Sequence, residues 1–194
     1  MSRILVTYAT NSRSTAEVAE TIANHLIETG HNADLKNIQD VSSIESYDAI
    51  IVGAPMIFGW HKLARSFLKK HREVLGNKKV AYFACAMRLT QVPGEKLADI
   101  PLTLDTSLAK APQKAGSLSI KERFTTIGYY LKPMINSAPN VKPVNIAFFN
   151  GKLETFRLKW WEAAFVMIVV QGVPGDYRNW EQIKDWSESV SRDL

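Results

Sequence analysis

The stretch RILVTYATNSRSTAEVAETIANHLI, residues 3–27, decides the fold of this 194-residue chain. Its first six residues are mostly apolar and favour β-structure, which predicts a buried strand over 3–8. A small polar loop follows at 9–15, and from Thr15 onward apolar residues recur at the spacing of one helical face. The order strand, polar loop, helix predicts a βα unit that opens an α/β domain.

The polar loop has the composition of an anion site. A helix N-terminus offers free backbone N–H groups and the positive end of the helix dipole. The loop side chains add hydroxyl and amide donors and one positive charge, and they are Thr10, Asn11, Ser12, Arg13, Ser14 and Thr15. The loop contains no glycine, so it is neither a Walker loop nor a dinucleotide fingerprint. A second interpretation stays open, in which Ser14 and Glu17 form a capping box and the loop only caps its helix.

Composition indicates one domain, residues 1–194, with 46% apolar residues, 22% charged residues and a net charge of +5. The positive charge favours an acidic substrate or an anionic membrane surface, and no nucleic-acid-binding motif is present. The single cysteine, Cys85, lies in an apolar run, which predicts a buried packing role in a reducing cytoplasm. The four histidines lack ligand spacing to one another or to Cys85, so no metal site is expected.

Strands and helices alternate along the rest of the chain, which predicts a parallel sheet with right-handed crossovers. Residues 87–118 break this rhythm, as a lid or binding loop would. The basic face of the helix at 60–72 is typical of a solvated surface. Further strands are expected at 33–38, 48–53, 79–86 and 141–149, and helices at 60–72, 119–132 (where Pro133 ends the helix) and from Asn179 onward. Ser119 and Glu122 would form a capping box for the helix at 119–132. Its buried face would carry Ile120, Phe124, Ile127 and Leu131, and the last helix would bury Trp180, Ile183, Trp186 and Val190.

A second unusual segment lies at 156–173. Basic residues and paired tryptophans precede an apolar run at 163–170, which is far shorter than the ~20 residues that span a bilayer. Three interpretations stay open: a helix in the core, a peripheral membrane contact, or a contact between copies in a homo-oligomer.

Three loops follow strand ends at one edge of the expected sheet, where ligands bind in open α/β folds. The loop at 9–15 offers phosphate donors. The second loop supplies an apolar and aromatic wall suited to a flat heterocycle such as a flavin, and the third adds a short apolar and basic turn. Their residues are Pro55, Met56, Ile57, Phe58, Gly59 and Trp60 in the second loop, and Ala86, Met87 and Arg88 in the third.

These motifs resemble those of flavodoxin-like proteins. TNSRST at 10–15 is similar to their phosphate loop, and GAP at 53–55 with FGW at 58–60 is similar to their second flavin loop. Later motifs are similar to the quinone-dependent protoporphyrinogen oxidases of bacteria: NGKL at 150–153, RLKWWE at 157–162, FVM at 165–167 and GDYRNWE at 175–181.

The resemblance implies a flavodoxin-like three-layer α/β/α sandwich with a five-stranded parallel sheet in the order 2-1-3-4-5. An insertion would follow strand 4, and an extra apolar helix strand 5. Noncovalent FMN would lie at the carboxyl edge, with its ring between 55–60 and 86–89 and Phe58 stacking on it. The phosphate would be held by Thr10, Asn11, Ser12, Ser14 and Thr15, and Arg13 stands where relatives often have glycine.

The expected function is that of an FMN-dependent oxidoreductase passing electrons from a reduced small-molecule substrate to a quinone or other acceptor. It would act in the cytoplasm, at the inner face of a membrane if 156–173 makes a membrane contact. Arg88, Lys152 and Arg157 are candidates for meeting substrate carboxylates, and no catalytic acid or base is identified. Two alternatives stay open: a flavodoxin-type electron carrier that exchanges electrons with a redox partner protein, and a binding module that has lost the cofactor.

Overall fold

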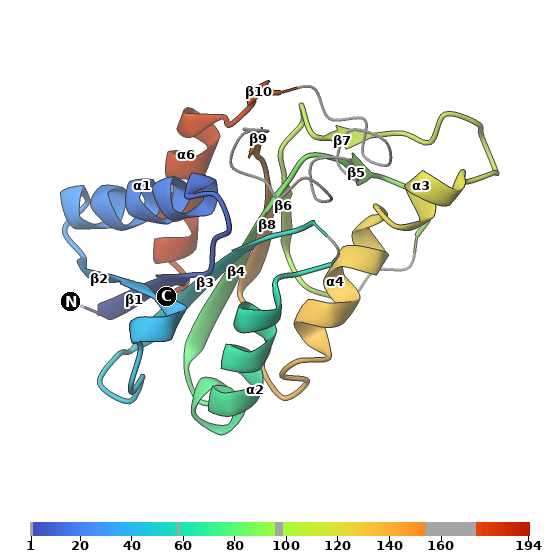
Figure 1. Ribbon diagram of the computed structural model, residues 1–194. Coiled ribbons are helices and arrows are strands. Elements are labelled where there is room, and N and C mark those ends of the chain that lie inside the picture. The colour runs from blue at the N-terminus through green and yellow to red at the C-terminus, as the bar shows by residue number, and fades with distance from the viewer. Residues whose placement is uncertain (1, 58, 96–98, 154–173) are drawn as a thin grey trace.

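The computed structural model describes residues 2–57, 59–95, 99–153 and 174–194 (Figure 1). These residues form a six-stranded parallel sheet in the order β2-β1-β3-β4-β8-β6. The strands are β1 Arg3–Tyr8, β2 Asn32–Asn37, β3 Ala49–Pro55, β4 Lys79–Ala86, β6 Leu102–Leu104 and β8 Asn145–Asn150. The predicted order 2-1-3-4-5 is confirmed, with β8 as the fifth strand, and the insertion adds β6 beyond it as a sixth strand.

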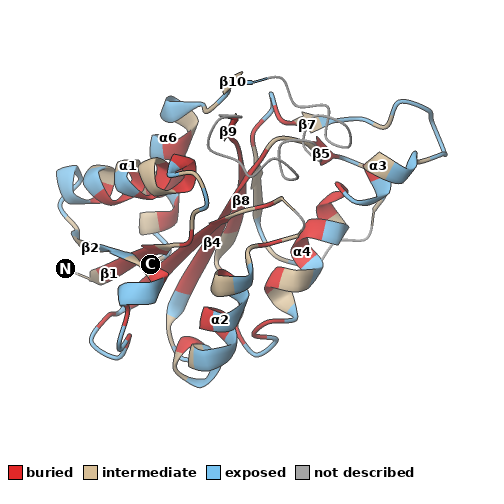
Figure 2. Ribbon diagram, in the orientation of Figure 1, coloured by how far each residue is buried: buried red, intermediate tan, exposed pale blue. Residues whose placement is uncertain are grey.

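Helices cover both faces of the sheet and complete the predicted three layers (Figure 1). On one face, α1 (Ser14–Glu28) and α6 (Trp180–Ser191) pack over Phe83 and Phe149 of the sheet. On the other face, α2 (Lys62–Leu75) and α4 (Ile127–Ile135) enclose a second core. The central strands β3 and β4 are buried except at one end residue each (Figure 2), as their continuous apolar sequences require. Because the strands are parallel, their carboxyl ends lie at one edge of the sheet, and the loops that lead to the helices of both layers surround that edge.

The insertion has regular structure, contrary to the expectation of a loop over 87–118. Besides β6, its strands β5 (Leu89–Thr90) and β7 (Ala109–Lys110) pair with each other. Buried Asp105 fixes the insertion to the sheet, because its carboxylate accepts from Ser107 N at 2.8 Å and from Asn150 N at 3.2 Å. Strands of two or three residues are too short to produce a periodic pattern, which is why the sequence did not reveal them.

The single helix predicted over 119–132 is wrong. The segment forms two helices, α3 (Ile120–Arg123) and α4, because Thr126 caps the second one and its hydroxyl accepts from Tyr129 N at 3.1 Å. The predicted capping box of Ser119 and Glu122 is confirmed at the start of α3. Pro133 lies inside α4 and does not end it.

The restart at Thr126 also overturns the predicted buried stripe of that helix. Ile120 and Phe124 are 76% and 53% exposed, whereas Ile127 and Leu131 are buried. At the last helix, the predicted cap Asn179 is confirmed, because its side chain accepts from Gln182 N at 3.1 Å. Trp180, which was expected to be buried, is 37% exposed. Local capping thus set the helical register in both places.

Shorter elements complete the described chain. They are the 3-10 turn η1 (Ile38–Asp40) and the antiparallel pair β9 (Lys152–Leu153) and β10 (Gly175–Asp176). The apolar helix expected after strand 5 falls within 154–173 and lies outside the described residues. Within the described ranges, no helix is both long enough and apolar enough to cross a bilayer.

Candidate functional site

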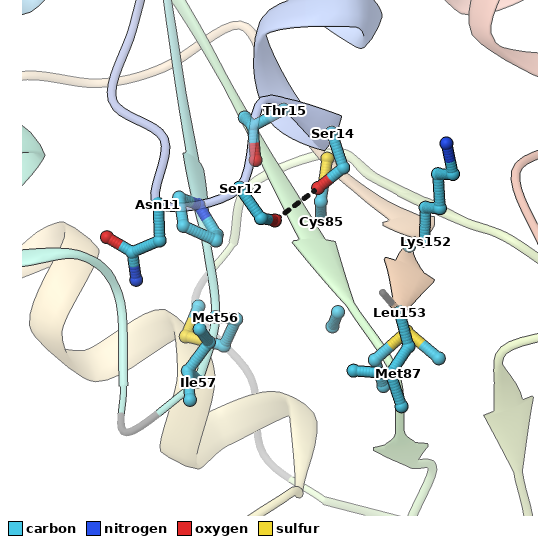
Figure 3. Close-up of a pocket in the computed structure, with 13 residues that line it drawn as sticks. Asn11, Ser12, Ser14, Thr15, Met56, Ile57, Cys85, Met87, Lys152 and Leu153 are labelled. Atoms are coloured by element: carbon cyan, nitrogen blue, oxygen red, sulfur yellow. Dashed lines mark hydrogen bonds between the residues drawn. The ribbon is translucent and has the colours of Figure 1, made fainter. Parts of the chain in front are cut away.

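Four loops at the carboxyl edge of the sheet line one pocket (Figure 3). The β1–α1 loop supplies polar side chains at one end, and the other three loops supply mostly apolar ones. The lining residues are Asn11, Ser12, Ser14 and Thr15; Pro55, Met56 and Ile57; Cys85, Ala86 and Met87; and Gly151, Lys152 and Leu153. All three loops named from the sequence therefore meet here.

The β1–α1 loop ends in a left-handed residue, Arg13, with φ 68° and ψ −19° at the N-cap of α1. The first helical N–H to bond back along the chain is that of Glu17, 3.1 Å from the Arg13 carbonyl oxygen. The N–H groups before it have no partner within the helix, as at any helix start. The loop is therefore built to receive an anion with backbone donors, while the Arg13 side chain is exposed and outside the pocket lining.

The predicted capping box of Ser14 and Glu17 is wrong. Ser14 is already the first helical residue, and no side chain caps α1. Its hydroxyl faces that of Ser12, with 3.5 Å between the two oxygens (Figure 3). The hydroxyls of this loop are thus directed to the pocket and not to the helix that follows.

Two buried hydroxyls of this region, those of Thr10 and Thr15, make no hydrogen bond of normal geometry among the described residues, although the Thr15 hydroxyl is close enough to the Cys85 thiol to oppose the rise in its pKa. Leaving a buried polar group unpaired costs about 1–3 kcal/mol. Thr15 lines the pocket, and Thr10 lies at the start of the same loop. A ligand with several acceptor oxygens would satisfy such donors, and a phosphate group fits this description.

Arg178 holds the first turn of α1 from outside the pocket. Its Nη1 donates to the Ser14 carbonyl at 3.2 Å and to Glu17 Oε2 at 2.6 Å, and its Nη2 pairs with Asp176. The side chain is only 3% exposed, and the guanidinium lies 4.3 Å from the centre of the Trp180 ring. The bond from Arg178 keeps the pKa of Asp176 below its usual value. The Arg178 guanidinium thus fixes the polar end of the pocket.

The β3–α2 loop closes on itself by a bridge between Met56 and Trp60, with Gly59 at φ 89°. Met56 and Ile57 face Met87 and Leu153 across the pocket (Figure 3). Trp60, named from the sequence as part of the wall, is 1% exposed and packs in the core 5.5 Å from the Tyr82 ring. Gly59 is also outside the pocket lining, and the expected stacking residue Phe58 lies outside the described residues.

Asn11 and His61 tie the first loop to the second. His61 Nε2 lies 3.0 Å from Asn11 Oδ1, while His61 Nδ1 accepts from Leu63 N at 3.3 Å and caps α2. These two bonds require a neutral imidazole with its hydrogen on Nε2. Burial lowers the pKa of His61, and the charges of Lys62 and Arg65 lower it further, so the neutral form is favoured.

The β4 and β8 ends complete the pocket. Cys85 is buried as predicted, and burial raises the pKa of its thiol to about 12, so it stays neutral and unreactive. Gly151 lies close to the end of β4, because a Cβ there would lie 3.1 Å from Met87 Sδ and 3.4 Å from the Ala86 carbonyl oxygen. Arg88 is outside the lining, and its carbonyl accepts from the Tyr130 hydroxyl at 3.1 Å.

The cofactor site predicted from the sequence omitted Cys85 and residues 151–153. The signal for 151–153 was available, since these residues directly follow the fifth strand, whose carboxyl end lies at the same sheet edge as the others. The assembled pocket combines hydroxyl and backbone donors at one end with apolar walls at the other. It suits a ligand that has an anionic group and a flat apolar body.

Comparisons with known proteins agree with this geometry. A family model described as "Flavodoxin domain" matches residues 5–177. Protoporphyrinogen IX dehydrogenase (quinone) of Escherichia coli (strain K12) is 22% identical over 200 residues, which cover 97% of this chain and 94% of that protein.

Solved flavodoxins share the fold. Two-electron reduced Megasphaera elsdenii flavodoxin is 12% identical with a TM-score of 0.52, covering 97% of this chain and 98% of that one. A point mutant of Fusobacterium nucleatum flavodoxin, bound to flavin mononucleotide, is 12% identical with a TM-score of 0.50, covering 100% and 98%. The chain therefore belongs to the flavodoxin-domain family, and it is a distant relative of the Escherichia coli dehydrogenase over its full length.

Proposed function

We propose that this protein binds FMN in the pocket and oxidises a reduced tetrapyrrole of the protoporphyrinogen type, with a quinone as electron acceptor. The observation that carries the cofactor assignment is the pair of buried hydroxyls of Thr10 and Thr15, in and just after the β1–α1 loop, which make no hydrogen bond of normal geometry to any of the described residues. The full-length relationship to a quinone-linked protoporphyrinogen dehydrogenase supports the substrate and acceptor.

The described residues fit both parts of the cofactor. The hydroxyls of Ser12, Ser14 and Thr15, with the N–H groups of the first turn of α1, would hold the phosphate. Ile57 and Met87, which lie on opposite sides of the pocket (Figure 3), are the apolar side chains that would hold the ring. FMN supplies the two-electron redox chemistry when it is bound.

The overall reaction balances without a further reactant. Each turnover removes two electrons and two protons from the reduced tetrapyrrole and adds them to the quinone, which becomes a hydroquinone. The chain contributes placement and electrostatics: Lys152 brings a positive charge to the pocket, and Cys85 stays a neutral thiol beside it. No side chain need act as a nucleophile.

The proposal is tested in two steps. The purified protein is first examined for flavin absorbance, with and without added FMN, and one FMN per chain is expected. Quinone-coupled oxidation of protoporphyrinogen by the FMN-loaded protein is then measured. A colourless protein that takes up no FMN contradicts the cofactor proposal and favours a binding module. Normal flavin binding without turnover on any of several quinones contradicts the substrate proposal alone.

A second candidate is a flavodoxin-type electron carrier with no substrate of its own. The similarity to the Megasphaera elsdenii flavodoxin, over 97% of this chain and 98% of that one, favours it. Electron exchange with a flavodoxin reductase, without tetrapyrrole oxidation, would support this candidate. A peripheral membrane contact through 156–173 and homo-oligomerisation stay predictions, because they rest on residues outside the described ranges.

A further inference from the structure

A second hollow lies beside the pocket, between α2 and α4. Its volume is about 340 Å³, and we call it the α2–α4 groove. Most of its lining side chains are basic or polar, and Gly59 of the β3–α2 turn also lines it. The lining residues are Gly59, Arg65, Lys69, Tyr129, Lys132, Pro133, Asn136 and Ser137.

The groove gathers positive charge from two helices. Arg65 and Lys69 stand one turn apart on α2, and Lys132 faces them from α4. None of the three forms an ion pair with a carboxylate in the part of the chain that the structure describes. Converging cations without a counter-ion raise the local concentration of anions. The groove is therefore electrostatically suited to an anionic ligand.

The helices that form the groove are fixed by the core beneath them. Phe67 and Leu68 of α2 and Leu131 and Met134 of α4 are buried in the same apolar cluster. The basic side chains therefore project from a rigid base, which reduces the entropy lost on binding. The sequence alone indicated that the basic face of α2 is solvated. In the structure, Arg65 and Lys69 of that face line the groove, whereas Lys62, Lys70 and Arg72 do not.

The groove adjoins the proposed flavin pocket. Ile57 lines the pocket and Gly59 lines the groove, two residues apart in the turn that the Met56–Trp60 bridge closes. Figure 1 shows the β3–α2 connection beside the start of α4. The two hollows thus share the β3–α2 turn, an arrangement that suits a ligand with an apolar ring at the pocket and carboxylate arms in the groove.

We propose that the α2–α4 groove binds the carboxylate side chains of the acidic substrate that is oxidised at the adjacent pocket. This inference rests on the proposed function and adds to it the subsite that recognises the substrate. Arg65, Lys69 and Lys132 would then determine specificity for the substrate carboxylates. Arg88 would not, because it lines neither hollow.

Equilibrium binding of protoporphyrin IX, a dicarboxylate, and of its dimethyl ester tests the proposal on the FMN-loaded protein. The groove variant carries Arg65→Gln, Lys69→Gln and Lys132→Gln. The matched control carries Lys62→Gln, Lys70→Gln and Arg72→Gln, which removes the same charge from α2 outside the groove. FMN affinity and turnover are measured in parallel on all three proteins.

We expect the groove variant to bind the dicarboxylate about tenfold more weakly than wild type, since it lacks the three cations that would pair with the two carboxylates in exposed ion pairs of modest strength. The control should change by less than about twofold, and added salt should weaken the wild-type complex. The dimethyl ester should bind wild type and groove variant equally, and FMN affinity should be unchanged.

Three results would overturn the proposal: no binding of the dicarboxylate to wild type, equal binding by wild type and groove variant, or the same loss in the control. An equal loss in the control would indicate diffuse attraction, as expected for an acidic partner protein or an anionic membrane. Charge-dependent binding without any turnover would instead contradict the proposed reaction while leaving the groove as a carboxylate site.

Discussion

The two ends of the pocket are built differently. At the polar end, the hydroxyls of Thr10 and Thr15 are buried without a partner in the described residues, although Arg178 fixes the backbone around them. At the apolar end, the bridge between Met56 and Trp60 closes the β3–α2 loop, and the Trp60 ring packs in the core against Tyr82. The Trp60 Nε1 is also buried without a partner in the described residues, but its ring is enclosed by the core, whereas the Thr15 hydroxyl lies in the pocket lining. Position in the pocket lining, and not the missing partner alone, therefore distinguishes the ligand site from the scaffold. Substitutions at either end, at the His61 link between them and at a control site should therefore differ in their effects on stability and on FMN affinity.

Trp60→Leu should have the largest effect, and only on stability. Replacing this 1% exposed side chain leaves a cavity in the core beside Tyr82, which should lower the free energy of unfolding by about 3 kcal/mol. Denaturant unfolding measures this loss. FMN affinity, measured under native conditions, should change less than about threefold; a much larger loss would place Trp60 in contact with the flavin.

Arg178→Met should weaken both properties. The change leaves Glu17 and Asp176 without their buried partner, but those carboxylates are 40% and 38% exposed, so the loss of stability should be about 2 kcal/mol rather than the larger value of a fully buried pair. FMN affinity should fall because the first turn of α1 loses its support.

Arg192→Met is the matched control for Arg178→Met. It breaks the exposed pair with Glu188, where both side chains are largely in solvent, and should change stability by less than about 0.5 kcal/mol. If the two arginine variants lose the same stability, the conclusion that Arg178 supports the polar end of the pocket is contradicted.

Thr15→Val should move the two measurements in opposite directions. FMN affinity should fall about tenfold, the value of one hydrogen bond to a charged phosphate. The apoprotein should be equally stable or slightly more stable, because the variant removes a buried hydroxyl that has no partner in the described residues. A Thr15→Ser variant should retain affinity. Loss of apoprotein stability in Thr15→Val would mean that the hydroxyl serves the fold and not a ligand.

The smallest expected effect is a pH dependence from His61, which links the two ends. Its folded pKa is lowered by burial, so the unfolded chain binds this proton more readily. The stability contributed by neutral His61 is therefore present above its ordinary pKa of 6.5 and is lost as pH falls below that value. The loss should be less than about 1 kcal/mol, since the ring is only partly buried. The free energy of unfolding of wild type and of His61→Gln, compared between pH 7.5 and 5.5, isolates this contribution. The same dependence of that free energy on pH in both proteins would contradict the prediction.

Much of the fold could be predicted because its strands are long, apolar and buried. The apolar sequence of β3 indicated a central strand, and the βα alternation indicated a parallel sheet, whereas the strand order 2-1-3-4-5 came from the resemblance to flavodoxin-like proteins. The insertion escaped prediction because β6 has three residues, too few for a periodic pattern. The helix break at Thr126 depends on one side-chain cap that competes with a continuous apolar stripe. Such choices are decided by tertiary packing.

Part of the candidate site could likewise be predicted from the sequence, and part could not. The polar loop could be read from its hydroxyls and its position before a helix. Trp60 could not be assigned from composition, since an aromatic residue serves equally as a ligand wall or as core, and only its burial decides. The role of Arg178 depends on contacts with Ser14 and Glu17 more than 160 positions earlier, which no local pattern contains.

The central claim is that the polar end of the pocket holds a phosphate. The most direct measurement is the affinity of the apoprotein for FMN compared with riboflavin, which has the same ring but no phosphate. If the α1 N-terminus and its hydroxyls grip the phosphate, FMN should bind at least a hundredfold more tightly, as two or more charge-assisted hydrogen bonds imply. Equal affinity for the two flavins would contradict the claim.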